Sequence, residues 1–131
     1  MMNISKGLWK DTIVAFFGEI PESTAPLMLK YKKAFDKYAA KDERWGVFFY
    51  AGIGFVEPMV EGLKRAGRDL TRERFVKEME GIKNFKGIFG RIDYSAFEPS
   101  DVYSRQGQKE VFLSQCLDEG KSKILTEWME P

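Results

Sequence analysis

The chain has 131 residues, a usual size for one domain, and 44% of them are hydrophobic, so a core can form. Its 21 Lys and Arg residues nearly balance its 20 Asp and Glu residues, and their interspersion argues against a nucleic-acid partner. Histidine is absent, which excludes Ser-His-Asp and Cys-His catalysis and nearly all catalytic zinc sites. We therefore predict no catalytic residues, no metal and no cofactor.

Membrane insertion and export signals are also not expected. No uncharged apolar run approaches the roughly 18 residues of a membrane span. The first ten residues lack the basic region and apolar segment of a signal peptide, which leaves the location of this chain open. The lone Cys116 lies in an alternating apolar stretch and is interpreted as a packed thiol without chemistry.

The first two predicted elements are a strand and a helix. Residues 12 to 17 are β-branched and aromatic, which predicts a mostly buried strand. Ser23 or Thr24 can cap a helix with Pro26 in its first turn. Apolar residues at helical spacing then predict an amphipathic helix over residues 25 to 40.

An aromatic and glycine-rich segment, residues 45 to 54, precedes the next predicted helix. That helix covers about residues 53 to 66 and stops at Gly67. Pro58 leaves two alternatives, because an interior proline forfeits a backbone hydrogen bond. Either the helix begins near residue 56, with Pro58 in its first turn, or it is kinked.

The remaining elements are a short helix and several strands. Thr71 is a candidate N-cap for a helix that ends near Gly81. Residues 84 to 105 are expected to form loops, with one short strand at 91 to 94. Residues 110 to 117 and 121 to 128 are strand-like, and the turn formers between them predict a β-hairpin.

The segment Gly52-Ile53-Gly54 follows an apolar run and is predicted to open a helix, as the glycines of a dinucleotide-binding turn do. Glu57 occupies the third glycine position and would place a negative charge near the phosphates. A nucleotide-dependent enzyme is therefore only the third hypothesis.

The aromatic residues 45 and 48 to 50 have two interpretations. Aromatic side chains usually lie in cores or interfaces, and the core is the default. The alternative is a pocket wall, because consecutive aromatics beside glycines can stack on a small ligand.

Several segments, taken in order over about 115 residues, resemble the C-terminal part of the proteins of a known family. They are "PLMLKYKKAFDKY", "FFYAGIGFVEPMVEGLKRAGRDLTRERFVKEMEGIKNFKG" and "YSRQGQKEVFLSQCLDEGKSKILTEW". Their succession is similar to the C-terminal third of type I periplasmic solute-binding proteins of the branched-chain amino acid group, also called extracellular ligand-binding receptors. The resemblance implies an α/β, partial periplasmic-binding-protein fold with about three helices and four strands.

The resemblance also implies a division of the chain between the two lobes of that fold. Residues 12 to 45 would belong to the C-terminal lobe and residues 46 to 70 to a crossover helix of the N-terminal lobe. Residues 71 to 131 would return to the C-terminal lobe. The rest of the family pattern is absent, so we expect exposed sheet edges and helix faces to be covered by homo-oligomerisation, most simply in a dimer.

By the same resemblance, the chain is a non-catalytic solute-binding component, or a truncated remnant, of an ABC-type importer. Its ligand would be an amino acid or similar small molecule, its partner a membrane permease, and the full-length family is periplasmic or at the cell surface. Phe48, Tyr50 and Gly52 are the predicted ligand-binding residues. The alternative is a structural, self-associating protein that has lost ligand binding.

Overall fold

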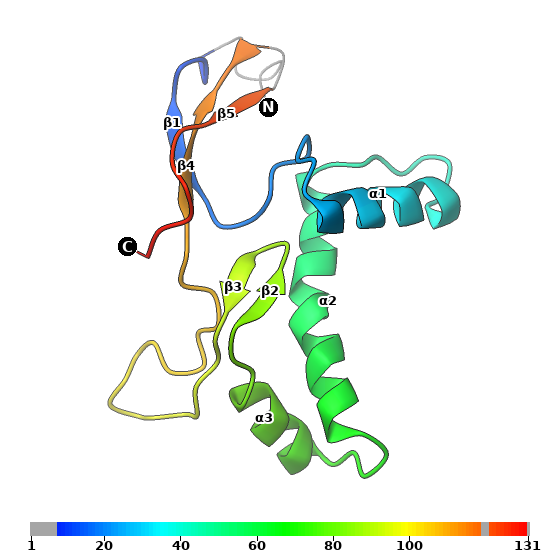
Figure 1. The fold of residues 1–131 in the computed structure, drawn as a ribbon, viewed down its shortest axis with the longest axis vertical. Coiled ribbons are helices and arrows are strands. Elements are labelled where there is room, and N and C mark those ends of the chain that lie inside the picture. Colours follow the sequence, from blue (N-terminus) through cyan, green and yellow to red (C-terminus); the bar gives the residue numbers. More distant parts are fainter. Residues whose placement is uncertain (1–7, 119–120, 131) are drawn as a thin grey trace.

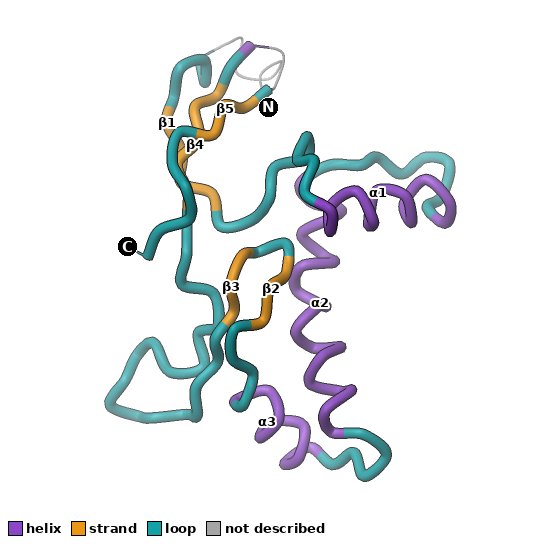
Figure 2. The backbone as a smooth tube through the Cα atoms, in the orientation of Figure 1, coloured by secondary structure: helices purple, strands orange, loops and turns teal. Residues whose placement is uncertain are grey.

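The computed structural model describes residues 8–118 and 121–130, which form three helices and five strands. Figures 1 and 2 show a strand-rich part that contains both ends of the described chain and a part built around one long helix. The predicted α/β class is confirmed, with one strand more than expected.

The sheet that joins the two ends of the chain has the strand order β1-β4-β5. Antiparallel pairing aligns β1 (Ile13–Phe16) with β4 (Phe112–Cys116), and β4 with β5 (Ser122–Ile124). The terminal hairpin is therefore confirmed, although residues 119 and 120 of its predicted turn lie outside the described residues. The prediction that the first strand is mostly buried is wrong. Its residues alternate between exposed and half-buried, because no helix lies over the sheet (Figure 1).

The first helix, α1, spans Pro26–Tyr38, close to the predicted range. Pro26 lies in the first turn, where its missing N–H costs no helical hydrogen bond. The predicted side-chain cap is absent, since the N-cap residue is Ala25. Ser23 instead accepts a hydrogen bond from the Ala25 N–H at 3.2 Å and shapes the approach to the helix.

The long helix α2 spans Val47–Ala66 and begins six residues before the predicted start. The aromatic and glycine-rich segment is thus helical, and Pro58 lies well inside the helix rather than in its first turn. Packing accounts for the difference, because tertiary contacts outweigh the modest helix propensities of aromatic residues and glycine. The buried residues recur every four positions and form one stripe along the helix: Tyr50, Gly54, Pro58, Gly62 and Ala66.

The third helix, α3, spans Arg72–Glu80 and begins as predicted. The Thr71 side chain accepts a hydrogen bond from the Arg74 N–H at 3.1 Å, which confirms Thr71 as the N-cap. The helix packs against the C-terminal half of α2, where Gly62 leaves room for Met79.

A second hairpin follows α3. The strands β2 (Phe85–Gly87) and β3 (Gly90–Ile92) pair antiparallel. The sequence analysis predicted β3 only in part and missed β2. The strand β2 has only three residues, and a glycine stands at each end of the turn that joins it to β3. Gly90 has a φ of 76°, a conformation that favours glycine.

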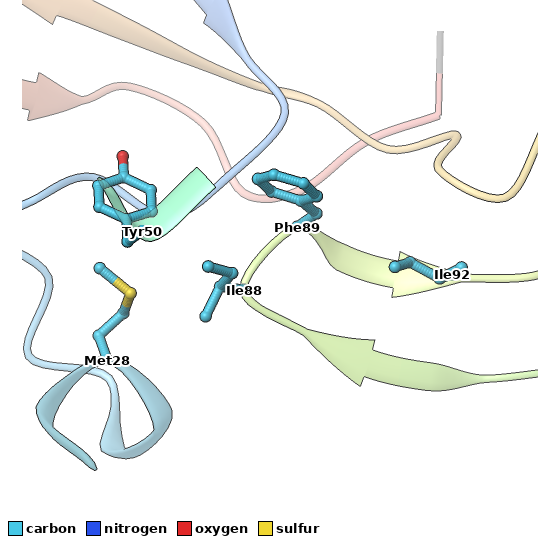
Figure 3. Packing of buried hydrophobic residues seen from close by; sticks show 5 residues of the cluster. All are labelled: Met28, Tyr50, Ile88, Phe89 and Ile92. Atoms are coloured by element: carbon cyan, nitrogen blue, oxygen red, sulfur yellow. The ribbon is translucent and has the colours of Figure 1, made fainter. Parts of the chain in front are cut away.

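The core lies where this hairpin turn meets the beginnings of α1 and α2. It consists of five buried residues (Figure 3): Met28, Tyr50, Ile88, Phe89 and Ile92. The Tyr50 hydroxyl donates a hydrogen bond to the Glu19 carbonyl, so the one polar group of this cluster is satisfied. Glu19, both helices and the hairpin are thereby held together.

Two glycines of α2 provide a matched test of this packing. A Cβ at Gly54 would lie 2.6 Å from Cζ of the buried Phe89 ring, whereas a Cβ at Gly52 would meet nothing within 4 Å. We expect Gly54→Ala to destabilise the fold by about 1–3 kcal/mol through overpacking. Gly52→Ala should stabilise it by about 0.5–1 kcal/mol, because alanine favours helices. Urea denaturation of both variants checks this, and equal midpoints would contradict it.

Candidate functional site

A groove of about 590 Å³ lies between α1, α2 and β2. Its size falls within the roughly 300–1,000 Å³ of small-molecule sites. Twelve residues line it, most of them from α2: Leu27, Tyr31, Phe49, Gly52, Ile53, Val56, Glu57, Val60, Glu61, Lys64, Phe85 and Lys86.

The wall of the groove is mainly apolar. Phe49 is fixed by its neighbours, since its ring meets that of Phe35 edge-on at 4.7 Å and lies 6.2 Å from that of Trp45. Val56 and Val60 continue the wall along α2, one helical turn apart. Such a surface can bind an apolar group of a ligand by excluding water.

The carboxylate of Glu57 forms the polar centre of the groove. One of its oxygens accepts a hydrogen bond from the Tyr31 hydroxyl at 2.6 Å, and the other accepts one from the Ile88 N–H at 2.8 Å. Burial and this bond to Glu57 raise the pKa of Tyr31, so its hydroxyl remains protonated and donating. Gly87 lets the Glu57 carboxylate come close to the β2–β3 turn, because a Cβ at this position would lie 2.5 Å from a carboxylate oxygen.

Charges of both signs surround this centre. Lys64 and Lys86 line the groove and form no ion pair with any described residue. Glu61 also lines it and pairs with Arg65 at 2.8 Å, one helical turn away. The groove therefore combines an apolar wall with positive and negative groups, a combination suited to a small zwitterion.

The three predicted ligand-binding residues do not come together at one place. Gly52 lines the groove. Phe48 is 85% exposed and is not among the lining residues, whereas Tyr50 is 1% exposed and belongs to the core. Phe49, between them, is the aromatic residue of the wall. A ligand-binding role for Phe48 and Tyr50 stays a prediction.

Sequence reasoning missed the polar residues of the groove. It treated Glu57 only as an obstacle to phosphate binding, and it did not single out Tyr31, Lys64 or Lys86. One signal was available for Glu57, which is a lone charge within the apolar run from Val47 to Val60.

The dinucleotide-binding interpretation fails on position. Gly52 and Gly54 lie inside α2 and do not open it. Backbone amides in a helix interior donate to the preceding turn, so they cannot converge on a phosphate as at a helix N-terminus. The Phe89 ring also fills the space beside Gly54, where a phosphate would need to approach.

The described part of the chain contains neither a cluster of metal ligands nor a membrane-spanning helix. Within residues 8–118 and 121–130, no three or more Cys, Asp or Glu residues are placed to hold a metal ion. The same residues include no helix with the length and apolar character needed to cross a bilayer.

The fold of the chain is α/β and matches part of a periplasmic-binding-protein fold. A solved leucine-binding protein, LivK from Thermotoga maritima, superposes with a TM-score of 0.67 and 16% sequence identity. The match covers 99% of this chain and 34% of LivK, so the chain spans about a third of that protein. No protein-family model and no curated protein matches the sequence significantly.

The Glu57 contacts predict that replacing Glu57 costs more folding stability than replacing the nearby Glu61. Glu57→Ala would leave the Ile88 N–H and the Tyr31 hydroxyl without their acceptor, at a cost of about 1–3 kcal/mol for each group that stays buried. Glu61→Ala removes a helical ion pair worth about 0.3–0.5 kcal/mol. Chemical denaturation should therefore show Glu57→Ala as the much less stable variant. Similar stabilities would mean that Glu57 does not join the segments.

Tyr50 predicts a loss of stability at alkaline pH. Burial, with smaller contributions from the Glu22 and Glu19 carboxylates, raises the pKa of Tyr50 from 10 to about 12. The unfolded chain then releases this proton before the folded chain does, so stability falls as pH rises above 10. The difference in unfolding free energy between wild type and Tyr50→Phe should shrink between pH 10 and 12. A difference in unfolding free energy that stays constant over this pH range would contradict the raised pKa of Tyr50.

Proposed function

We propose that the chain is a non-catalytic solute-binding component, or a remnant of one, of an ABC-type importer for amino acids or similar small molecules. Two observations support it. The fold matches a third of a leucine-binding protein over nearly the whole of this chain. The groove pairs an apolar wall with charges of both signs. The groove carries the proposal, because a shared fold does not by itself determine function.

An apolar amino acid would use each part of the groove. Its side chain would pack on Phe49 and Val56, beside the open space at Gly52. Its carboxylate would lie near Lys64 and Lys86, since these cations have no carboxylate partner among the described residues. Its ammonium group would face the acidic side of the groove at Glu57.

The lobe assignment is part of the same proposal. Residues 12 to 45 and the terminal hairpin would belong to one lobe, and residues 46 to 70 would cross to the other. Both α3 and β2 contact α2, which favours a return of the chain to the C-terminal lobe after β3 rather than at residue 71. A membrane permease would be the partner, and the complete protein would act in the periplasm or at the cell surface.

Calorimetric titration with leucine, isoleucine, valine and phenylalanine tests the proposal. We expect saturable binding of at least one of them by the wild-type chain. The double variant Lys64→Gln, Lys86→Gln should bind about 10- to 100-fold more weakly, because it loses charged contacts to the carboxylate.

Lys32→Gln, Lys33→Gln is the matched control, since it removes the same charge from exposed positions of α1 outside the groove. It should bind like wild type. No heat with any ligand would overturn the proposal, as would equal weakening in both double variants.

The second candidate is a structural protein that self-associates and has lost ligand binding. The large apolar side chains that α2 leaves exposed, such as Phe48, Phe55 and Met59, favour it. It predicts an oligomer that shows no heat in the same titrations.

A further inference from the structure

Helix α2 contains three glycines, and packing explains the absence of a side chain at two of them. A Cβ at Gly54 would lie 2.6 Å from the Phe89 ring, and a Cβ at Gly62 would collide with the side chain of Met79. Each of these glycines makes room for a residue of another element. At Gly52 a Cβ would meet nothing within 4 Å, so no contact within the described chain requires glycine there.

The backbone of Gly52 does not require glycine either. Gly52 lies inside α2, away from the capping residues Gly46 and Gly67, and its φ is not in the left-handed region. Glycine weakens a helix interior relative to alanine, because it loses more conformational entropy on folding. The chain therefore carries an unfavourable residue that keeps a space open without serving its own packing.

The space beside Gly52 belongs to the candidate groove. Phe49 precedes Gly52 by three residues and Val56 follows it by four, so all three lie on the same side of α2. A helical side chain covers the turn that precedes its own Cα. A side chain at position 52 would therefore extend toward Phe49 and occupy the groove.

The walls near Gly52 are held in place by their own contacts. The Phe49 ring lies 4.7 Å from the Phe35 ring and 6.2 Å from the Trp45 ring. The rings of Phe35 and Trp45 are themselves 5.6 Å apart. On the α1 side, the Tyr31 hydroxyl is fixed by its hydrogen bond to α2. Closely packed groups cannot move aside freely, so bulk added at position 52 would reduce the room in the groove.

We propose that Gly52 determines the size of the ligand side chain that the groove accepts. The space that this glycine leaves open receives the branched or aromatic side chain of an apolar amino acid, in contact with Phe49 and Val56. Each additional CH₂ group buried there strengthens binding about fourfold. A larger residue at position 52 removes this gain for large side chains and leaves small ones unaffected. This role of Gly52 rests on the proposed solute binding.

Calorimetric titration with alanine, valine, leucine and phenylalanine tests the proposal on the wild-type chain, Gly52→Ala and Gly52→Leu. Wild type should bind leucine about 10- to 100-fold more tightly than alanine, because leucine has three more carbon atoms to bury. Gly52→Leu should bind leucine and phenylalanine about 10- to 100-fold more weakly than wild type does, with little change for alanine. Gly52→Ala should have intermediate affinities.

The substitutions at position 52 should leave the fold intact. A Cβ there meets nothing within 4 Å, and alanine and leucine both favour helices. Urea denaturation checks that neither variant is less stable than wild type. Ala34→Leu is the matched control, because it adds an apolar side chain at an exposed position of α1 outside the groove. It should bind all four amino acids as wild type does.

The possible outcomes distinguish the role of Gly52 from solute binding itself. Equal leucine affinity of wild type and Gly52→Leu would overturn the role of Gly52 and leave solute binding intact. Equal weakening of alanine and leucine binding in Gly52→Leu would also overturn it, since the groove would then be lost for ligands of every size. A wild-type chain that binds none of the four amino acids would overturn the proposed function and the role of Gly52 with it.

Discussion

The carboxylate of Glu57 is the interaction on which the rest of the structure depends. Its two oxygens join α2 to α1 through the Tyr31 hydroxyl and to the β2–β3 turn through the Ile88 N–H. These bonds fix three segments that are distant in sequence, and the candidate groove is the space between them. Glu57 is half-buried, and a carboxylate that is partly removed from water needs hydrogen-bond donors, so the same residue contributes both to the packing and to the polar centre of the groove.

Helix α2 is apolar on most of its circumference. Its buried stripe is rich in small residues, and Gly54 and Gly62 let Phe89 and Met79 approach the helix axis. Large apolar side chains elsewhere on the helix, such as Phe48 and Met59, remain exposed. A helix of this kind is normally buried all round, so α2 leaves more apolar surface uncovered than a surface helix usually does.

The architecture separates the two ends of the chain from the groove. β1 pairs with β4, about a hundred residues later, in a sheet that does not line the groove. The groove depends instead on α1, α2 and β2, which are closer in sequence. The candidate groove and the closure of the fold therefore depend on different elements, and substitutions in the groove can be studied without disturbing the terminal sheet.

The sequence by itself determined the α/β class, α1, the Thr71 cap and the pairing of the last two strands, because short-range spacing, capping and turn chemistry specify these features. Only the tertiary structure decided where α2 begins, and with it which aromatic faces the groove. Starting the helix at Val47 directs Phe48 to solvent, Phe49 to the groove and Tyr50 to the core. Successive residues turn by about 100° in a helix, and a predicted helix that began only after these residues gave no basis for separating them. The role of Glu57 was equally hidden, since its partners Tyr31 and Ile88 are 26 and 31 residues away.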